Sequence, residues 1–205
     1  MKHDDVCRIE SRELPLDLLA KTRLVDRLSP RRVPLGSTWI EQGAGAIGEF
    51  YMRQRLWPDF EYHGKPQART EIERAGLVTV GDVGFIDDDG YVFMLDRKKD
   101  MVISGGVNIY PAEIESVLIT HPGVSDCAVI GIPDDEFGEI AAAIVDPANG
   151  ALDEQALRGW LGDRIARNKL PRRFIFRSDL PREDSGKIFK NRLREEFWTG
   201  QKRRI

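Results

Sequence analysis

Residues 96–115 read DRKKDMVISGGVNIYPAEIE, and this stretch decides most of what the sequence predicts about the fold. After the charged run at its start, the apolar segment Met101–Ile103 predicts a short strand. Gly105 and Gly106 allow the backbone to take positive φ or to approach a ligand or another strand closely. Pro111 predicts the first turn of a helix, whose free N–H groups could face an anion. A strand, a glycine turn and a helix are therefore expected in direct succession.

Strand and helix patterns continue to alternate toward the C-terminus. The predicted strands are Cys127–Ile130, Ala141–Val145 and Phe174–Phe176. Asp153 is predicted to cap a helix that runs to about Asn168, with one face formed by Ala156, Trp160, Leu161 and Ile165. A last helix is predicted over Ile188–Trp198. Together these patterns predict that residues 98–205 form a complete α+β domain, a short sheet packed by helices.

Residues 1–97, which precede this domain, have a different sequence pattern. Leu14–Leu28 predicts one helix, and strands are predicted over Glu49–Arg53, Gly76–Val80 and Tyr91–Leu95. Asp87–Gly90 predicts the hairpin turn that precedes the last of these strands. We expect a domain boundary after Arg97, where this pattern of strands and hairpin turns ends.

Composition excludes several classes of protein. The chain has 205 residues, 41% hydrophobic and 32% charged, which predicts a globular protein with a real core. It contains no apolar run near the ~20 residues of a membrane helix, and residues 1–5 lack a signal peptide's apolar stretch. Cys7 and Cys127 cannot form a disulfide framework, so a cytoplasmic location is expected. The three histidines are scattered and predict no zinc site.

Charge is unevenly distributed along the chain. Residues 164–205 contain 14 Lys and Arg against 5 Asp and Glu, whereas the net charge of the whole chain is −3. This basic segment predicts either an anionic ligand or a solvated helical face. A nucleic acid is disfavoured as the ligand, because the isoelectric point is about 5.7 and no nucleic-acid-binding motif occurs.

A long, ordered set of motifs resembles the adenylate-forming superfamily of acyl- and aryl-CoA ligases, luciferases and peptide adenylation domains. The motifs are Gly81–Gly84, Gly90–Tyr91, Asp96–Gly106, Asn108–Glu115 and Pro181–Lys187. Within the superfamily, the chain most resembles bacterial fatty-acid or bile-acid CoA ligases. The resemblance implies that residues 98–205 are the small C-terminal domain and that residues 1–97 are the tail of the large AMP-binding domain.

The resemblance also implies a two-step reaction. A carboxylate attacks the α-phosphate of ATP to give an acyl-adenylate, and the small domain then rotates so that the thiol of CoA can displace AMP. ATP and CoA are thus the implied ligands, with a lipid-like or aromatic carboxylic acid as the substrate and Mg²⁺ as the family's metal.

Two motif residues resemble the nucleotide-binding residues of the family. Asp82 matches the aspartate that holds the ribose hydroxyls, and its two carboxylate oxygens suit two O–H donors. Arg97 matches an arginine that contacts the nucleotide. The plainer alternatives are a turn aspartate at Asp82 and a surface ion pair of Arg97 with Asp96 or Asp100.

Other motif residues resemble those that act when the small domain of the family rotates. Lys99 matches the hinge position, although a solvated charge pair with Lys98 is the simpler interpretation. Ser104, Gly105 and Gly106 match the loop that lines the pantetheine tunnel of CoA. Lys187 matches the lysine that bridges the carboxylate and the α-phosphate, and its place after Gly186 predicts a mobile loop.

The sequence departs from the family in its N-terminal part. The 205 residues contain no Gly/Ser/Thr-rich, lysine-containing phosphate loop. Residues 36–38 resemble the family's next element, but Trp39 stands where the Mg²⁺-binding glutamate belongs, so no metal site is expected. The chain alone is therefore expected to be a truncated, inactive ligase. The alternative is a binding module that docks on a separate large domain or associates with itself.

Overall fold

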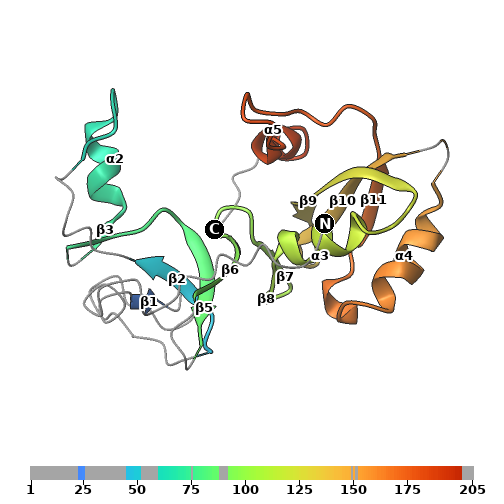
Figure 1. The fold of residues 1–205 in the computed structure, drawn as a ribbon, viewed down its shortest axis with the longest axis horizontal. Coiled ribbons are helices and arrows are strands. Elements are labelled where there is room, and N and C mark those ends of the chain that lie inside the picture. The colour runs from blue at the N-terminus through green and yellow to red at the C-terminus, as the bar shows by residue number, and fades with distance from the viewer. Residues whose placement is uncertain are drawn as a thin grey trace. The chain divides into compact units, whose positions relative to one another are not determined.

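The computed structural model describes residues 23–25, 45–51, 60–74, 76–87, 92–148, 150 and 152–199. The chain forms two compact units, Met1–Lys98 and Lys99–Ile205 (Figure 1). Short sheets and helices occur in succession along the chain, which confirms the predicted α+β class. No described helix is long and apolar enough to cross a membrane.

The first unit is built on a four-stranded sheet in the order β1-β2-β5-β6, with every neighbouring pair antiparallel. Its strands are β1 (Arg23–Val25), β2 (Gly48–Tyr51), β5 (Asp82–Ile86) and β6 (Val92–Arg97). Helix α2 (Pro66–Glu71) leads into a small second sheet formed by β3 (Glu73–Arg74) and β4 (Leu77–Val78).

The helix predicted over residues 14–28 is wrong at residues 23–25, which form strand β1. Pairing with β2 explains the difference, because a long-range partner overrides the local helical spacing of leucines. The rest of that predicted helix, and residues 88–91 of the predicted hairpin, lie outside the described residues.

The second unit is built on a three-stranded sheet in the order β11-β10-β9 (Figure 1). Long strands β9 (Val124–Asp134) and β10 (Gly138–Pro147) pair antiparallel, and β11 (Arg173–Phe176) runs parallel to β10. The remaining elements are β7 (Val102–Ser104), β8 (Val107–Ile109), α3 (Pro111–Leu118), α4 (Glu154–Gly162), the 3₁₀ turn η1 (Arg167–Lys169) and α5 (Lys190–Glu195).

Both faces of this sheet are buried, which explains the continuous apolar runs of its strands. Successive side chains of a strand point to opposite faces. Val129, Ala143 and Val145 therefore pack in one core cluster with residues of α3 and α4. Ile130 and Ile144 pack in a second cluster, which includes Leu193 of α5. A two-sided core of this kind holds helices on both faces of one small sheet.

Helix α4 differs from its predicted form in length and in its buried face. As predicted, the Asp153 carboxylate caps the helix by accepting hydrogen bonds from the backbone N–H groups of Gln155 and Ala156. The helix ends at Gly162, however, and not near residue 168. Leu161 is buried and Ile165 packs against the core, as predicted, whereas Ala156 is exposed and its neighbour Leu157 is fully buried instead. Helix α5 is likewise shorter than the predicted Ile188–Trp198.

Cys127 is a core residue of β9 with only 6% of its surface exposed. Its thiol lies 3.7 Å from the backbone oxygen of Glu115. Burial, with the nearby carboxylates of Glu115 and Asp126, raises the pKa of the Cys127 thiol from 9.0 to about 12. The thiol is therefore protonated in the native protein at neutral pH and is inert as a nucleophile.

We expect Cys127 in a Cys7→Ser chain to react with iodoacetamide at pH 8.5 at least ~100-fold more slowly in the native state than in urea. The raised pKa also means that the native state keeps its proton while the unfolded state loses it. The contribution of this group to stability should therefore be complete below pH 9 and decline between pH 9 and pH 12. Equal alkylation rates in native and unfolded protein would contradict the buried position.

Candidate functional site

The residues singled out from the sequence fall into two groups, one in each unit. Asp82 and Arg97 belong to the first unit. Lys99, the Ser104–Gly106 loop and Lys187 belong to the second.

Asp82 and Arg97 lie opposite each other on the antiparallel strands β5 and β6. Arg97 Nε is 3.4 Å from Asp82 Oδ1, so the guanidinium pairs with Asp82 across the sheet. The Arg97 side chain is 45% exposed and that of Asp82 is 23% exposed, which leaves donors and acceptors accessible to a ligand. The register of one hairpin thus places side by side a carboxylate, which can accept from hydroxyl groups, and a guanidinium, which can donate to an anion.

A buried carboxylate that sequence reasoning missed supports this pair. Glu49 on β2 is only 5% exposed and accepts hydrogen bonds from the Thr79 hydroxyl at 3.1 Å and the Lys98 ammonium at 3.1 Å. The Tyr51 hydroxyl also donates to it, at 3.4 Å. A buried charge is stable only with such partners. The only sequence signal for this role is a glutamate inside an otherwise apolar strand.

The Glu49 partners hold the backbone on both sides of the Asp82–Arg97 pair. The Thr79 hydroxyl accepts a hydrogen bond from the Gly81 N–H at 2.9 Å, directly before Asp82. The Lys98 N–H donates to the Gly81 carbonyl at 2.7 Å, directly after Arg97. Glu49 therefore orders the two chain segments that carry the pair.

We expect Glu49→Gln to lower the free energy of unfolding of the first unit by about 1–3 kcal/mol, because Lys98 loses its charged partner. Hydrogen exchange at residues 79–83 and 97–98 provides the local measurement. Glu73→Gln, which breaks the exposed Arg69–Glu73 pair, serves as the matched control and should change little. An equal effect of the two substitutions would contradict the structural role of Glu49.

Ser104 is the last residue of β7, and Gly105 and Gly106 form the turn to β8, with positive φ of +56° and +83°. The Gly105 N–H donates to the Phe137 carbonyl at 3.0 Å, which docks the turn on the β9–β10 connection. A Cβ at Gly105 would lie 2.9 Å from the Phe137 ring, whereas a Cβ at Gly106 would meet nothing within 4 Å. The two glycines are thus required for different reasons.

Glu139 on β10 fixes the strand that leads into this turn. Its Oε2 accepts a hydrogen bond from the Ile103 N–H at 3.0 Å, and the residue is only 6% exposed. Gly131 makes room for this carboxylate, since a Cβ there would lie 2.1 Å from Glu139 Oε1. Neither residue was singled out from the sequence, because their contact depends on the pairing of β9 with β10.

We expect Gly105→Ala to destabilise the second unit more than Gly106→Ala. Each substitution places alanine at positive φ, which costs about 1–2 kcal/mol. Only the change at Gly105 also pushes a methyl group into the Phe137 ring. Urea denaturation measures the difference. If Gly106→Ala proved the more destabilising, the docking of this turn on Phe137 would be contradicted.

Lys187 lies in a short hairpin that is closed by an antiparallel bridge between Arg182 and Ile188. The Glu183 N–H donates to the Lys187 carbonyl at 2.8 Å, and Gly186 takes φ +83°. Arg182 braces the hairpin by donating to the Gly186 carbonyl at 2.5 Å and by pairing with Asp126 on β9. The structure shows a hydrogen-bonded hairpin here, and the mobility expected from the sequence stays a prediction.

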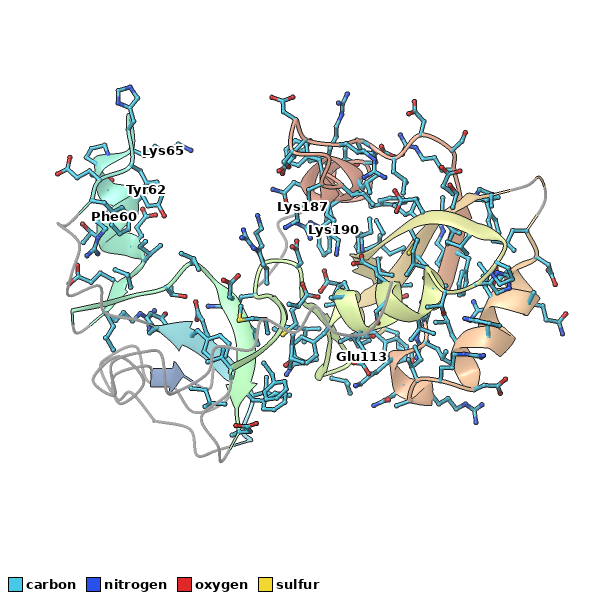
Figure 2. All side chains as sticks on the ribbon, viewed as in Figure 1. Phe60, Tyr62, Lys65, Glu113, Lys187 and Lys190 are labelled. Atoms are coloured by element: carbon cyan, nitrogen blue, oxygen red, sulfur yellow. The ribbon has the colours of Figure 1, made fainter. Side chains whose placement is uncertain are left out.

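The Lys187 side chain is exposed, and within the described ranges no ion pair involves its ammonium group (Figure 2). Lys190, three residues later, is by contrast paired with Glu115 at 2.7 Å. Lys169 is paired with Glu113 on α3 at 2.8 Å. The structure therefore distinguishes Lys187, which has no ion-pair partner among the described residues, from Lys169 and Lys190, which have structural partners. The sequence alone does not show this difference.

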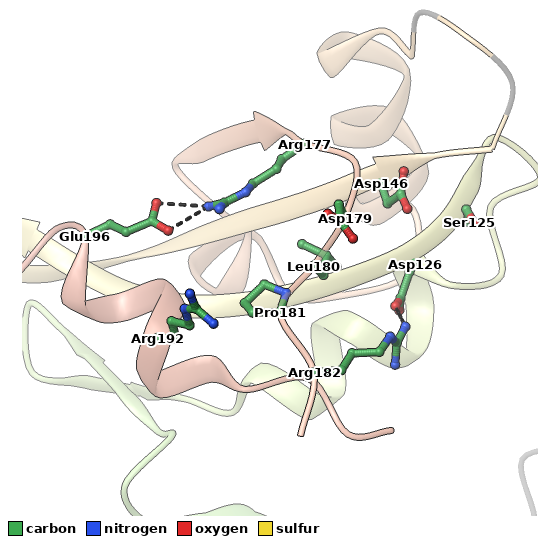
Figure 3. A pocket seen from close by; sticks show the side chains of 10 residues that line it. All are labelled: Ser125, Asp126, Asp146, Arg177, Asp179, Leu180, Pro181, Arg182, Arg192 and Glu196. Carbon is green, nitrogen blue, oxygen red and sulfur yellow. Dashed lines mark hydrogen bonds and ion pairs between the residues drawn. The ribbon is translucent and has the colours of Figure 1, made fainter. Parts of the chain in front are cut away.

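A polar pocket of about 660 Å³ lies at the base of this hairpin (Figure 3). Two ion pairs cross its lining, Arg177 with Glu196 and Arg182 with Asp126. Its lining contains none of the site residues singled out from the sequence. Among the described residues, no group of three or more His, Cys, Asp or Glu is placed to hold a metal ion.

Comparisons with known proteins point to one group of enzymes. Residues 113–187 match the family model of the AMP-binding enzyme C-terminal domain. The chain is 51% identical over 137 residues to the long-chain-fatty-acid–CoA ligase FadD13 of Mycobacterium tuberculosis, a match that covers 67% of this chain and 27% of the relative. It is 48% identical over 137 residues to a feruloyl-CoA synthase of Amycolatopsis, covering 66% of this chain and 28% of the relative.

The fold is also similar to that of a solved o-succinylbenzoate–CoA synthetase from Bacillus subtilis. The TM-score is 0.71 at 28% identity, and the match covers 84% of this chain and 33% of that structure. The chain thus spans between a quarter and a third of the length of the proteins it matches.

Proposed function

Because the chain contains an AMP-binding enzyme C-terminal domain, we propose that it supplies the C-terminal part of an ATP-dependent acid–CoA ligase. In the first step a carboxylate oxygen attacks the α-phosphate of ATP, which forms an acyl-adenylate and releases pyrophosphate. In the second step the CoA sulfur attacks the acyl carbon, the thioester forms, and AMP leaves. The observation that carries the proposal is the exposed Lys187 ammonium on a braced hairpin, inside the matched region.

Lys187 is proposed as the catalytic cation of the first step. A compact ammonium group can offset the negative charge that builds up on the α-phosphate and can orient the attacking carboxylate. The Arg182 brace supports this role, because a cation acts in the transition state only if it is held in place beforehand.

Asp82 and Arg97 are proposed as nucleotide ligands. The Asp82 carboxylate would accept hydrogen bonds from the ribose hydroxyls, and Arg97 would donate to the same nucleotide. Their partial exposure and fixed spacing support the assignment. Lys99 is proposed as the hinge, and the Ser104–Gly106 turn as the lining of the path by which the CoA thiol reaches the acyl group.

The proposed substrate is a lipid-like or aromatic carboxylic acid. The names of the two relatives support this class, since one acts on long-chain fatty acids and the other yields feruloyl-CoA. A cytoplasmic location is proposed, because ATP and CoA would be the substrates there and because the two widely spaced cysteines predict a reducing compartment. The Mg²⁺ that the family uses is not assigned to residues of this chain, because Trp39 replaces the expected glutamate.

The 205 residues lack the phosphate loop, so the proposed activity requires a large AMP-binding domain. The purified chain alone is expected to release no carboxylate-dependent pyrophosphate at a typical enzyme rate of ~1 s⁻¹. Addition of a separately expressed large domain from a related ligase should restore release if the chain can dock on it. Activity of the chain alone would contradict this part of the proposal.

In such a complemented assay, we expect Lys187→Ala to slow adenylate formation by about 10²–10³ and to leave thioester formation from a preformed acyl-adenylate nearly unchanged. Gly106→Leu should show the reverse pattern, because its side chain would enter the proposed path of the thiol. Arg192→Ala removes another exposed cation of the same segment and is the matched control. Equal loss of both half-reactions in Lys187→Ala would make the lysine a structural residue and would contradict the assignment.

A further inference from the structure

An ion pair that the proposed chemistry does not use lies just after the proposed hinge. Arg194 Nη1 is 2.8 Å from Asp100 Oδ1, and the two side chains are only 8% and 9% exposed. The second Arg194 nitrogen, Nη2, donates to the Asn191 side chain on the same helix. A pair so far from water is retained only with good geometry and satisfied partners, and removal of one charge leaves the other buried and unpaired.

The pair marks the point where the chain enters the core of the second unit. Lys99 is exposed, whereas Asp100, Met101 and Val102 are 7%, 3% and 0% exposed. If the backbone rotates at Lys99, Asp100 is therefore the first residue of the second unit that is held in place.

The other member of the pair lies on α5, a helix that cannot hold itself in place. With six residues, α5 is too short to be stable in isolation. It is anchored through buried Leu193, through Lys190 paired with Glu115 on α3, and through Arg194. Helix α5 begins three residues after Lys187, so its anchors hold the C-terminal side of the Lys187 hairpin, in addition to the Arg182–Asp126 pair on the other side.

From these contacts we propose that Asp100 and Arg194 are positioning residues that join the hinge to the Lys187 hairpin. The carboxylate fixes the first residue after Lys99, and the guanidinium fixes the helix that follows Lys187. A rotation of the backbone at Lys99 is thereby transmitted to the Lys187 hairpin with little loss of amplitude. The functional meaning of this link rests on the proposed ligase activity, but the link itself is a property of this chain.

A purely stabilising ion pair would have a different signature. Its loss would raise the population of globally unfolded molecules and would speed exchange throughout the second unit. Loss of a positioning link should instead loosen the two segments it joins and leave the β9–β10 core protected.

Hydrogen exchange of the full 205-residue chain, followed by mass spectrometry, separates these two cases. In Arg194→Met we expect exchange to rise at least tenfold in residues 97–103, which lie more than 90 positions away in sequence, and in residues 181–195. Asp100→Asn should affect the same two segments, and the double variant should exchange no faster than the faster single variant. Core amides of β9 and β10 should change by less than threefold.

Two further variants serve as controls. Arg177→Met breaks the exposed Arg177–Glu196 pair, which also reaches the end of α5, and should change both segments by less than twofold. Arg194→Lys keeps a cation at the buried position and should bring exchange in both segments back to within about threefold of the parent chain.

The proposal is overturned if exchange in the core rises as much as exchange in the two segments, if only the α5 segment responds, or if Arg194→Lys exchanges as fast as Arg194→Met. Should Arg194→Met fail to fold, Arg194→Lys and Asp100→Asn decide by the same criterion of both segments against the core. None of these measurements needs ligase activity, so a failed activity assay would count against the proposed function alone.

Discussion

The antiparallel pairing of β9 with β10 is the constraint on which the second unit depends. The register runs without interruption from Gly138 opposite Asp134 to Asp146 opposite Asp126. This pairing divides the apolar side chains into two clusters and so gives helices a place on both faces. Two of the proposed functional elements are also attached to it. The glycine turn contacts Phe137 between the strands, and the Lys187 hairpin is braced by Asp126 on β9.

The local elements of this protein were largely predictable from the sequence, as was the family resemblance, which the comparisons confirm. Asp153 as a helix cap, Pro111 as a first helical residue and the apolar runs of β9 and β10 are signals that act over a few residues. The lengths of α4 and α5 were overestimated, and one element type was wrong because a distant partner determines it. Residues 23–25 form a strand because β2 is available for pairing, although their leucine spacing is helical.

The candidate site shows the same division. Asp82, Arg97 and Lys187 were recognised through motifs, but the roles proposed for them remain proposals. Glu49, Glu139 and the Asp100–Arg194 pair were not recognised, because each has a partner that lies 30 to 94 positions away. A lone glutamate in an apolar strand carries no information about which donors will surround it after folding. Buried charges of this kind fit only one arrangement of their neighbours, and we regard this selectivity as their contribution to the fold.

The slot that Gly131 leaves for the Glu139 carboxylate limits how this sequence can change over evolution. Any side chain at position 131 would displace the carboxylate that accepts the Ile103 hydrogen bond, and the strand leading into the glycine turn would lose its anchor. A shorter residue at position 139 would remove the steric conflict but also the acceptor. Neither position can therefore drift by itself. A larger residue at 131 would need a shorter residue at 139, and that double change would still leave the Ile103 N–H without its acceptor.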